Sequence, residues 1–257
     1  MKISASVVTY NNEKEIRGVL NSLVNSDCVN LMDIFVVDNC STDKTVEIIE
    51  EEYPQIRLIR SPKNGGYGYG HNQALCLSNA DYHFVINPDI IFEPTLISAA
   101  IKFMDDNPDT VIAIPNIYDE DNQLKMPPKR DPKVRYLIAR FFPTIGVFQK
   151  WRDSYVAKDL VLMSDGKTPY EIEICSGSFM ILRRKVAEEV GFFDERYFMY
   201  FEDFDLSRSV RANGRIVCLP QLKVIHEGKR AAHSSKTARN MMLDSMWKYF
   251  RKWGFKL

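Results

Sequence analysis

The stretch Ile34-Phe35-Val36-Val37-Asp38-Asn39-Cys40-Ser41 places four apolar residues directly before a run of short polar ones. A short, continuous apolar run is typical of a β-strand that is buried on both faces. The polar residues predict the end of this strand, and Ser41 can cap a helix that continues through Ile49. A buried strand followed at once by a helix indicates an α/β fold.

The same unit recurs on both sides of this stretch. Residues 3–9 predict an earlier strand, and apolar residues at helical spacing predict a helix over residues 16–24. Later, residues 56–59 and 84–86 predict strands, with a helix near residues 74–77 between them. Because strand and helix alternate with short loops, the first half predicts a mostly parallel, Rossmann-like central sheet flanked by helices.

Polar residues follow three of the predicted strands. In parallel α/β sheets, ligands bind outside the carboxyl ends of the strands. The three clusters are Thr9-Tyr10-Asn11, Asp38–Ser41 and Asn87-Pro88-Asp89. Their positions predict a ligand-binding site at one edge of the sheet.

The second half of the chain has a different pattern. Residues 127–153 are rich in Pro, Arg and aromatic residues without a clear period, which predicts a loop with partial helix. Beyond it we expect two strands, a helix and two further strands, over residues 172–174, 179–182, 205–213, 216–219 and 223–226. Pro220 separates the last two.

Composition sets only broad limits. The 257 residues hold 34 Lys+Arg and 34 Asp+Glu, so the net charge indicates no particular partner. Five cysteines without a C-x-x-C spacing predict neither a disulfide framework nor a zinc site, and fit a reducing cytoplasm. No signal-peptide pattern or run of transmembrane length is present, so we expect a cytoplasmic protein whose membrane contact, if any, is peripheral.

The C-terminal segment is basic and amphipathic. Residues 229–257 contain eight Lys or Arg and a single acid, Asp244. One face of the predicted helix carries Met242, Met246, Tyr249, Phe250 and Trp253. Such a helix can lie in a membrane interface, or its apolar stripe can pack on the rest of the protein. Both interpretations stand at this point.

A glycine-rich segment, Asn64-Gly65-Gly66-Tyr67-Gly68-Tyr69-Gly70-His71-Asn72, follows the third predicted strand. Glycines allow the backbone to approach a phosphate, and the following helix N-terminus favours its charge. A flexible surface turn explains the same composition. The segment does not match the spaced dinucleotide fingerprint, which follows the first strand.

Five acidic or basic groups are candidates for chemistry. Glu202 and Asp203 are adjacent carboxylates between two phenylalanines, which suits a general base with a raised pKa. Asp89, at a strand end, suits Mg²⁺ or Mn²⁺, and Asp38 suits the base or ribose of a nucleotide. Taken singly, each also fits an ordinary turn or helix cap, and His226 fits a structural role.

In order along the chain, these segments resemble family 2 glycosyltransferases of the GT-A fold. Within that family, the resemblance is to bacterial rhamnosyltransferases that build surface polysaccharides, and it covers residues 3 to about 230. The matching segments are Val8–Asn11, Val37–Asp43, Asn64–Gly66, Asn87–Asp89, Cys175–Ser178, Phe201–Asp205 and His226–Gly228.

The resemblance implies a role for particular residues. It implies a catalytic base at Asp203 beside Glu202, and metal contacts at Asp89 and His226. The first Asp of the family's D-x-D motif is Asn87 here, which is a poorer metal ligand. The implied nucleotide pocket consists of Thr9, Tyr10, Asn11, Asp38, Asn64, Gly65, Gly66, Asn72 and Asn87.

The resemblance also implies an organisation and a reaction. Residues 1–230 would form the glycosyltransferase domain, with a nucleotide-binding half (1–110) and an acceptor-binding half (111–230), before a basic helix (231–257). The enzyme would be an inverting hexosyltransferase that uses Mg²⁺ or Mn²⁺. Its donor would be dTDP-L-rhamnose, or alternatively a UDP-linked hexose. Its acceptor would be a glycan or polyprenyl-diphosphate-linked glycan at the inner face of the plasma membrane, and not a nucleic acid.

Two other classes of protein share some of these sequence features. An NAD-dependent oxidoreductase also uses a βαβ sheet, but its glycine fingerprint should follow the first strand, where Tyr10-Asn11-Asn12-Glu13 stands instead. A binding module without turnover would share the sheet and the nucleotide pocket. The presence of Glu202-Asp203 together with His226 argues for the enzyme.

Overall fold

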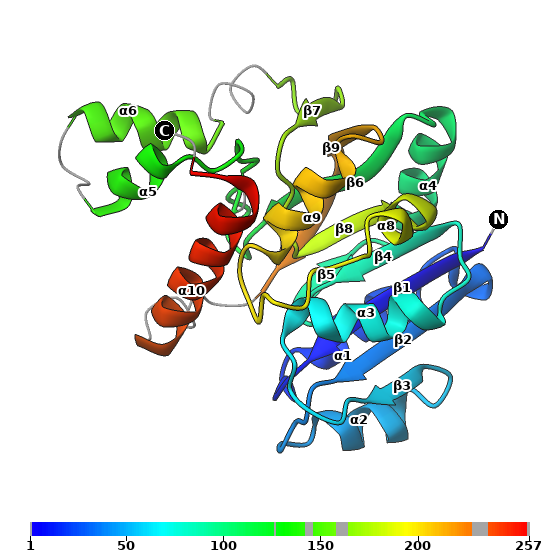
Figure 1. The fold of residues 1–257 in the computed structure, drawn as a ribbon. Coiled ribbons are helices and arrows are strands. Elements are labelled where there is room, and N and C mark those ends of the chain that lie inside the picture. The colour runs from blue at the N-terminus through cyan, green and yellow to red at the C-terminus, as the bar shows by residue number, and fades with distance from the viewer. Residues whose placement is uncertain (1, 126, 142–145, 158–163, 228–235, 256–257) are drawn as a thin grey trace.

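The computed structural model describes residues 2–125, 127–141, 146–157, 164–227 and 236–255. Within these ranges a curled nine-stranded sheet has helices on both faces (Figure 1). Its strand order is β3-β2-β1-β4-β8-β6-β9-β5, and β7 pairs with β9. The predicted α/β class is confirmed.

The first half forms the parallel part of the sheet. Its strands are β1 (Ile3–Thr9), β2 (Met32–Asp38), β3 (Arg57–Arg60) and β4 (Tyr82–Ile86). β1 pairs in parallel with both β2 and β4, and β2 pairs in parallel with β3. All four predicted strands are therefore present, in the expected arrangement.

The second half adds strands of both directions. They are β5 (Ile90–Phe92), β6 (Thr110–Tyr118), β7 (Tyr170–Ile172), β8 (Phe179–Arg183) and β9 (Arg215–His226). β8 runs antiparallel between β4 and β6, and thereby joins the two halves into one sheet.

The prediction of two strands separated by Pro220 is wrong. β9 is a single strand, and its pairing with β6 shifts register there, because Pro115 lies opposite Leu219 while Asn116 lies opposite Lys223. A proline has no N–H for the ladder and is tolerated at such an irregularity. The shift therefore accommodates Pro220 within one continuous strand.

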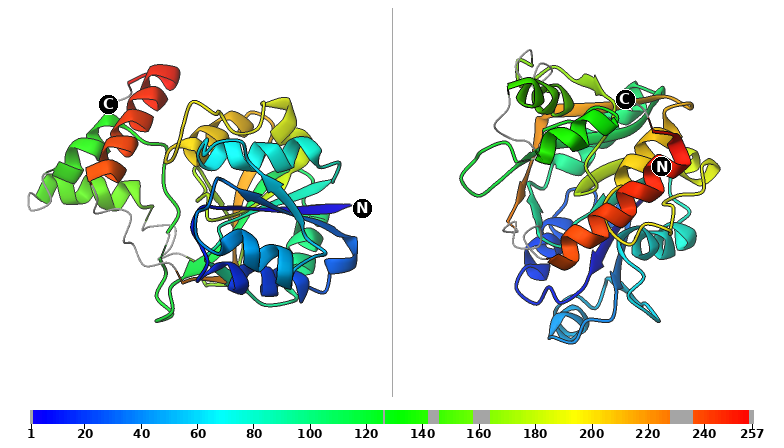
Figure 2. Two further views of the ribbon diagram at one scale, coloured as in Figure 1. Left: turned by 90° about the horizontal axis from the view of Figure 1, so that it is seen from below. Right: turned by 60° about the vertical axis from the view of Figure 1, so that its left-hand side comes forward.

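Helices cover both faces of the sheet (Figure 2). One face packs against α1 (Ile16–Val24), α2 (Thr45–Glu52) and α4 (Leu96–Asp106), near the short 3-10 helix η1 (Val29–Leu31). The other face packs against α3 (Tyr67–Leu77), α8 (Arg184–Glu189) and α9 (Glu202–Val210). Both layers bury aliphatic side chains against the sheet, which is the main source of stability in such folds.

Three helices lie together beyond one end of the sheet (Figures 1 and 2). They are α5 (Val134–Phe141), α6 (Gly146–Tyr155) and α10 (Lys236–Trp253). Residues 127–153 thus contain two helices, more than the partial helix that their irregular pattern indicated.

The apolar stripe of α10 packs on the protein. Tyr249 and Phe250 are fully buried in a cluster with residues of α9, and Met242, Met246 and Trp253 pack against it. The packing interpretation therefore accounts for the stripe on which the membrane interpretation rested. The predicted residues 231–235 and 256–257 lie outside the described ranges. Among the described helices, none combines the length and the apolar character that a membrane span requires.

A chain of hydrogen-bonded polar side chains is buried beneath α3. Ser4 Oγ lies 2.7 Å from both Ser78 Oγ and His83 Nδ1. Ser6 Oγ lies 2.7 Å from both His83 Nε2 and His71 Nδ1. Burial lowers the pKa of His83 to about 3 and holds that of His71 well below its ordinary value. Both imidazoles are therefore neutral in the folded protein.

We expect these histidines to make stability depend on pH. In the unfolded chain both bind protons below about pH 6.5, while the folded form does not until the pH is far lower. The free energy of unfolding should therefore fall with decreasing pH, by up to about 1.4 kcal/mol per pH unit for each histidine. Urea unfolding between pH 7 and pH 5 measures this slope. His83→Gln should reduce it, and an unchanged slope would contradict the assignment.

Candidate active site

The loops after β1 and β2 lie side by side at the carboxyl edge of the sheet. The β1–β2 register places Thr9 opposite Asp38. Asn11, with a left-handed φ of 57°, donates its N–H to Ser41 Oγ at 2.9 Å, and its Oδ1 accepts the N–H of Thr42 at 2.7 Å. The hydrogen bonds of Asn11 therefore join the loop after β1 to the loop after β2.

The predicted nucleotide residues of these loops differ in exposure. The Asp38 carboxylate is buried and accepts the N–H of Ser41 at 3.1 and 3.2 Å. The Thr9 hydroxyl is also buried, and it donates to Asn12 Oδ1 at 3.1 Å. Tyr10 is half exposed. A carboxylate has about four acceptor positions, so Asp38 retains capacity for a ligand.

The glycine loop before α3 is fixed by the segment that precedes α9. Gly66 has a φ of 93°, and a Cβ there would overlap the carbonyl group of Phe198, so only glycine fits. Asn64 Oδ1 accepts the N–H of Gly66 at 3.2 Å, and Tyr67 donates its N–H to Phe198 O at 2.9 Å. The loop is thus a defined turn rather than a flexible one.

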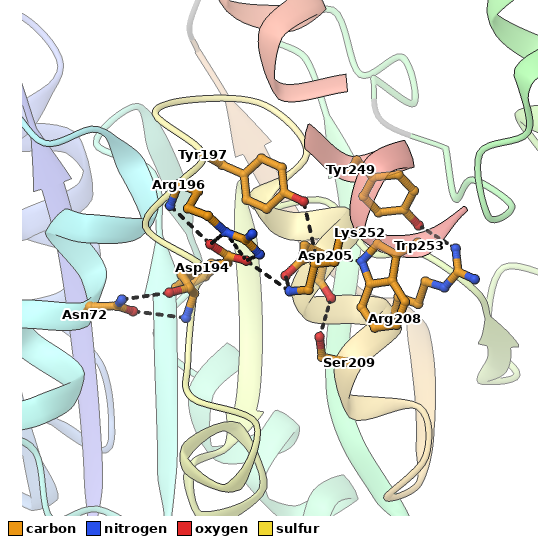
Figure 3. Close-up of polar contacts among 11 residues, drawn as sticks. Asn72, Asp194, Arg196, Tyr197, Asp205, Arg208, Ser209, Tyr249, Lys252 and Trp253 are labelled. Carbon is orange, nitrogen blue, oxygen red and sulfur yellow. Dashed lines mark hydrogen bonds and ion pairs between the residues drawn. The ribbon is translucent and has the colours of Figure 1, made fainter. Parts of the chain in front are cut away.

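Asn72 has a structural role that the sequence did not reveal. Its Oδ1 accepts the N–H of Phe193 at 3.0 Å, and its Nδ2 donates to Phe193 O at 2.9 Å (Figure 3). Nδ2 also donates to Glu195 Oε1 at 2.9 Å. The side chain is buried. Because its amide is engaged inside the protein, we leave Asn72 out of the proposed nucleotide contacts.

The acidic pair begins α9 directly after a strained turn. Tyr200 and Phe201 both have left-handed φ values, 70° and 67°. Each such non-glycine residue costs roughly 1–3 kcal/mol and persists only where its surroundings hold it. The Phe201 ring lies 4.9 Å from that of Phe204 and 5.4 Å from that of Tyr249, centroid to centroid. Aromatic packing therefore supports the turn that presents Glu202 and Asp203.

Asp203 is held by backbone N–H groups. Its carboxylate accepts from Gly177 at 3.0 Å and from Phe204 at 2.9 Å. The hydroxyl of Tyr67 donates to Gly177 O, on the other side of the same peptide segment. Burial, with nearby acidic groups such as Asp203 and Asp89, holds the pKa of Tyr67 well above its ordinary value, so it stays protonated.

The surroundings act differently on the pKa values of the two carboxyl groups. Burial and the neighbouring Asp203 raise the pKa of Glu202 well above its ordinary value, and among the described residues its Oε2 has no hydrogen-bond partner. Burial also raises the pKa of Asp203, but Lys129 and backbone N–H groups oppose that rise. Glu202 is therefore the more readily protonated of the two, and Asp203, the less buried, is the more readily ionised.

A second polar cluster forms where β5 pairs with β9. Ile90 lies opposite His226, and Asp89 O accepts the N–H of Glu227 at 2.9 Å. This pairing places His226 Nε2 3.6 Å from Asp89 Oδ1. Lys125 Nζ lies 2.8 Å from both Nδ1 and the carbonyl oxygen of His226.

The segment between Cys175 and β8 connects the two clusters. Gly177 donates its N–H to Asp203, as described, and Ser178 O accepts the N–H of Asn87 at 3.0 Å. The acidic pair and the Asp89–His226 pair therefore belong to one site, at the edge where the β1 and β2 loops also lie.

The family model of glycosyl transferase family 2 matches residues 4–191. The chain belongs to this family. It is 29% identical over 221 residues to the N-acetylglucosaminyl-diphospho-decaprenol L-rhamnosyltransferase of Mycobacterium tuberculosis, covering 79% of this chain and 67% of that protein. It is 27% identical over 237 residues to the rhamnosyltransferase WbbL of Escherichia coli K12, covering 86% of this chain and 81% of WbbL.

Solved structures show the same fold. The mannosyltransferase PcManGT of Pyrobaculum calidifontis, in complex with GDP-Man and Mn²⁺, matches with a TM-score of 0.65 and 17% identity. The match covers 97% of this chain and 64% of that chain. This glycosyltransferase therefore has the GT-A fold, as its resemblance to the family implied.

A divalent cation fits the Asp89–His226 cluster of this glycosyltransferase. Asp89 Oδ1 is buried and, within the described residues, accepts no hydrogen bond, which suits a carboxylate reserved for a ligand. Lys125 Nζ lies 2.8 Å from His226 Nδ1, and Nε2 can bind a metal ion in the tautomer that leaves this nitrogen unprotonated. The described part of the chain contains no group of three His, Cys, Asp or Glu that could hold a metal.

Three contributors to the site were not singled out from the sequence. Tyr67 lies in the glycine-rich segment, which was interpreted only through its glycines. Lys125 and Lys129 precede α5, and the sequence indicated no role for either side chain. Their positions depend on contacts with His226 and with Phe204, whose ring lies 5.2 Å from Lys129 Nζ. No local sequence pattern encodes such long-range contacts.

We expect Lys129→Met to raise the pKa of Asp203. Burial already raises this pKa and the Lys129 charge lowers it, so removing the charge leaves burial unopposed. The carboxylate should then take up its proton at a higher pH than in the wild type. Titration of the Asp203 carboxyl carbon by NMR measures the change. Lys133→Met, on the same segment, should leave the titration unaltered, and an unchanged Asp203 in Lys129→Met would contradict the electrostatic assignment.

Proposed function

We propose that this glycosyltransferase transfers L-rhamnose from dTDP-L-rhamnose, with inversion, to a glycan or polyprenyl-diphosphate-linked glycan during synthesis of a surface polysaccharide. The observation that carries the chemistry is the Asp203 carboxylate at the carboxyl edge of the sheet, beside Glu202, held by the N–H groups of Gly177 and Phe204. The sugar rests on the two rhamnosyltransferase relatives, one of which is named for a diphospho-decaprenol acceptor. A lipid-linked acceptor of that kind would place the reaction at the cytoplasmic face of a membrane.

Asp203 acts as the general base in this proposal. A carboxylate with a raised pKa is a better proton acceptor than an ordinary aspartate, and Asp203 already has its charge held by two N–H groups. It removes the proton of the acceptor hydroxyl as that oxygen attacks the anomeric carbon. A single displacement of this kind inverts the configuration and requires no covalent enzyme intermediate.

The donor lies against the opposite part of the edge. We propose that its nucleotide contacts Thr9, Tyr10, Asn11, Asp38, Asn64, Gly65, Gly66 and Asn87, which surround the β1, β2 and β4 ends. Asp89 and His226 would hold Mg²⁺ or Mn²⁺ together with the diphosphate. The chemistry that such a cation supplies is neutralisation of the charge that grows on the leaving diphosphate.

The test of this function is a donor screen. Purified protein is mixed with dTDP-L-rhamnose or a UDP-hexose, Mn²⁺ and a polyprenyl-diphosphate-linked acceptor, and release of nucleoside diphosphate is measured. We expect release from dTDP-L-rhamnose. Calorimetry that shows binding of UDP but none of dTDP would overturn the donor and favour the UDP-hexose alternative.

Two neighbouring substitutions test the base. Asp203→Asn should lower kcat by about 100-fold or more, because the base acts chiefly in the transition state, while the donor KM changes little. Glu202→Gln is the matched control: it replaces a neutral acid by a neutral amide of the same shape, so a much smaller loss is expected. Turnover of Asp203→Asn near the wild-type rate would exclude this role.

Metal dependence is tested at Asp89. EDTA should stop the reaction and Mn²⁺ or Mg²⁺ should restore it. Asp89→Asn should weaken the apparent affinity for Mn²⁺ by more than about tenfold, since even an outer-shell partner contributes that much. Asp121→Asn, at an exposed acid, should not. Full activity of the wild type in EDTA would rule out the cation.

A further inference from the structure

Asp205 is a buried carboxylate on α9, two residues beyond the proposed base. Only 2% of it is exposed. Trp253 Nε1 and Lys252 Nζ, both from α10, donate to its two oxygens at 2.6 and 2.7 Å, and Tyr197 donates at 3.3 Å (Figure 3). A buried charge requires such donors. Asp205 therefore joins the first turn of α9 to the last turn of α10.

The same face of α10 also bonds to residues 194–199, the segment that leads into the strained turn. Lys252 Nζ reaches Asp194 Oδ2 at 3.0 Å, and Lys248 Nζ donates to Arg196 O at 2.8 Å. One turn earlier, Ser245 Oγ donates to Met199 O at 2.8 Å. Asp194 and Met199 thus have partners on α10, immediately before the left-handed residues.

Apolar packing acts on the turn from the same side. The Tyr249 ring is fully buried against those of Phe201 and Phe204, and its hydroxyl donates to Asp131 Oδ1 at 2.7 Å. Two successive left-handed residues would relax without such support. Apart from the bond to Asp131, the α10 contacts described here therefore fall on the turn, its leading segment or the first residues of α9.

We infer that Lys252 and Trp253 are positioning residues: acting through Asp205, they hold the start of α9 so that Asp203 is aimed at the acceptor hydroxyl. This inference rests on the proposed role of Asp203 as the base. The reason is geometric, because a misplacement of about 1 Å can cost about 100-fold in rate. In the described part of the chain, the proposed donor contacts Thr9, Asn11 and Asp38 bond within the β1 and β2 loops and not to α10. Lys252 and Trp253 bond to Asp205 and not to the glycine loop, so their substitution should change donor binding little.

The experiment compares the same substitution at two places on one helix. Trp253→Phe removes the N–H that bonds to Asp205 but keeps an aromatic ring, whereas Trp247→Phe alters a residue that is 53% exposed. We expect Trp253→Phe to lower kcat at least tenfold with the donor KM within twofold of wild type. Trp247→Phe should match the wild type in both. Lys252→Met should behave like Trp253→Phe, and Lys252→Arg, which retains the charge, should recover most of the loss.

A double-mutant cycle shows whether the effect passes through Asp203. In an Asp203→Asn background, Trp253→Phe should add less than a twofold further loss. A full additional loss would overturn the inference, as would wild-type kcat in both Trp253→Phe and Lys252→Met. A loss of kcat accompanied by a similar loss of donor affinity and by a lower melting temperature would also overturn the inference. That pattern would indicate a purely structural role for these residues. If instead Asp203→Asn alone keeps wild-type turnover, the proposed function fails, and that result is separate from any result at α10.

Discussion

The parallel pairing of β1 with β2 and β4 fixes where every polar loop of the first half can lie. Because the three strands run in one direction and in register, Thr9 ends opposite Asp38, and Val7 lies opposite Ile86 at the end of β4. Their loops must leave the sheet at the same edge. Apolar residues on both faces secure the strands between two helical layers. The site is therefore a consequence of strand direction before any catalytic side chain is considered.

The second half completes the site by antiparallel pairing. β8 joins β4, which brings Ser178 beside Asn87, and β5 joins β9, which brings His226 beside Asp89. Each pairing connects residues that are far apart along the chain. The electrostatics follow from that assembly: the acidic pair is buried when α9 packs on the sheet, and burial is the first cause of both raised pKa values. Lys129 and two backbone N–H groups favour the charged form of Asp203.

The sequence predicted what depends on local periodicity and order. The four strands of the first half, the helices between them and the polar strand ends were correct because each is encoded within a few residues. The bonds of Asn72 could not be predicted, because an amide inside a glycine-rich segment looks the same whether it binds a ligand or Phe193. The roles of Tyr67, Lys129 and Asp205 were missed, because their partners lie on other elements. The buried Ser4–His83–Ser6–His71 chain was missed for the same reason, since serines in a strand usually face solvent.

The position of α10 along the chain has a consequence for the order in which the protein becomes functional. Lys252 and Trp253 follow Asp205 by 47 and 48 positions, so a ribosome makes the acidic turn well before the residues that hold it. The nine strands, which end at His226, are also made before α10. A nascent chain can thus assemble its sheet and its donor-side loops while Tyr200 and Phe201 are still free to leave their left-handed conformation. In the proposed mechanism, docking of α10 is then the step that holds Asp203 in its working position, and it follows synthesis of the sheet.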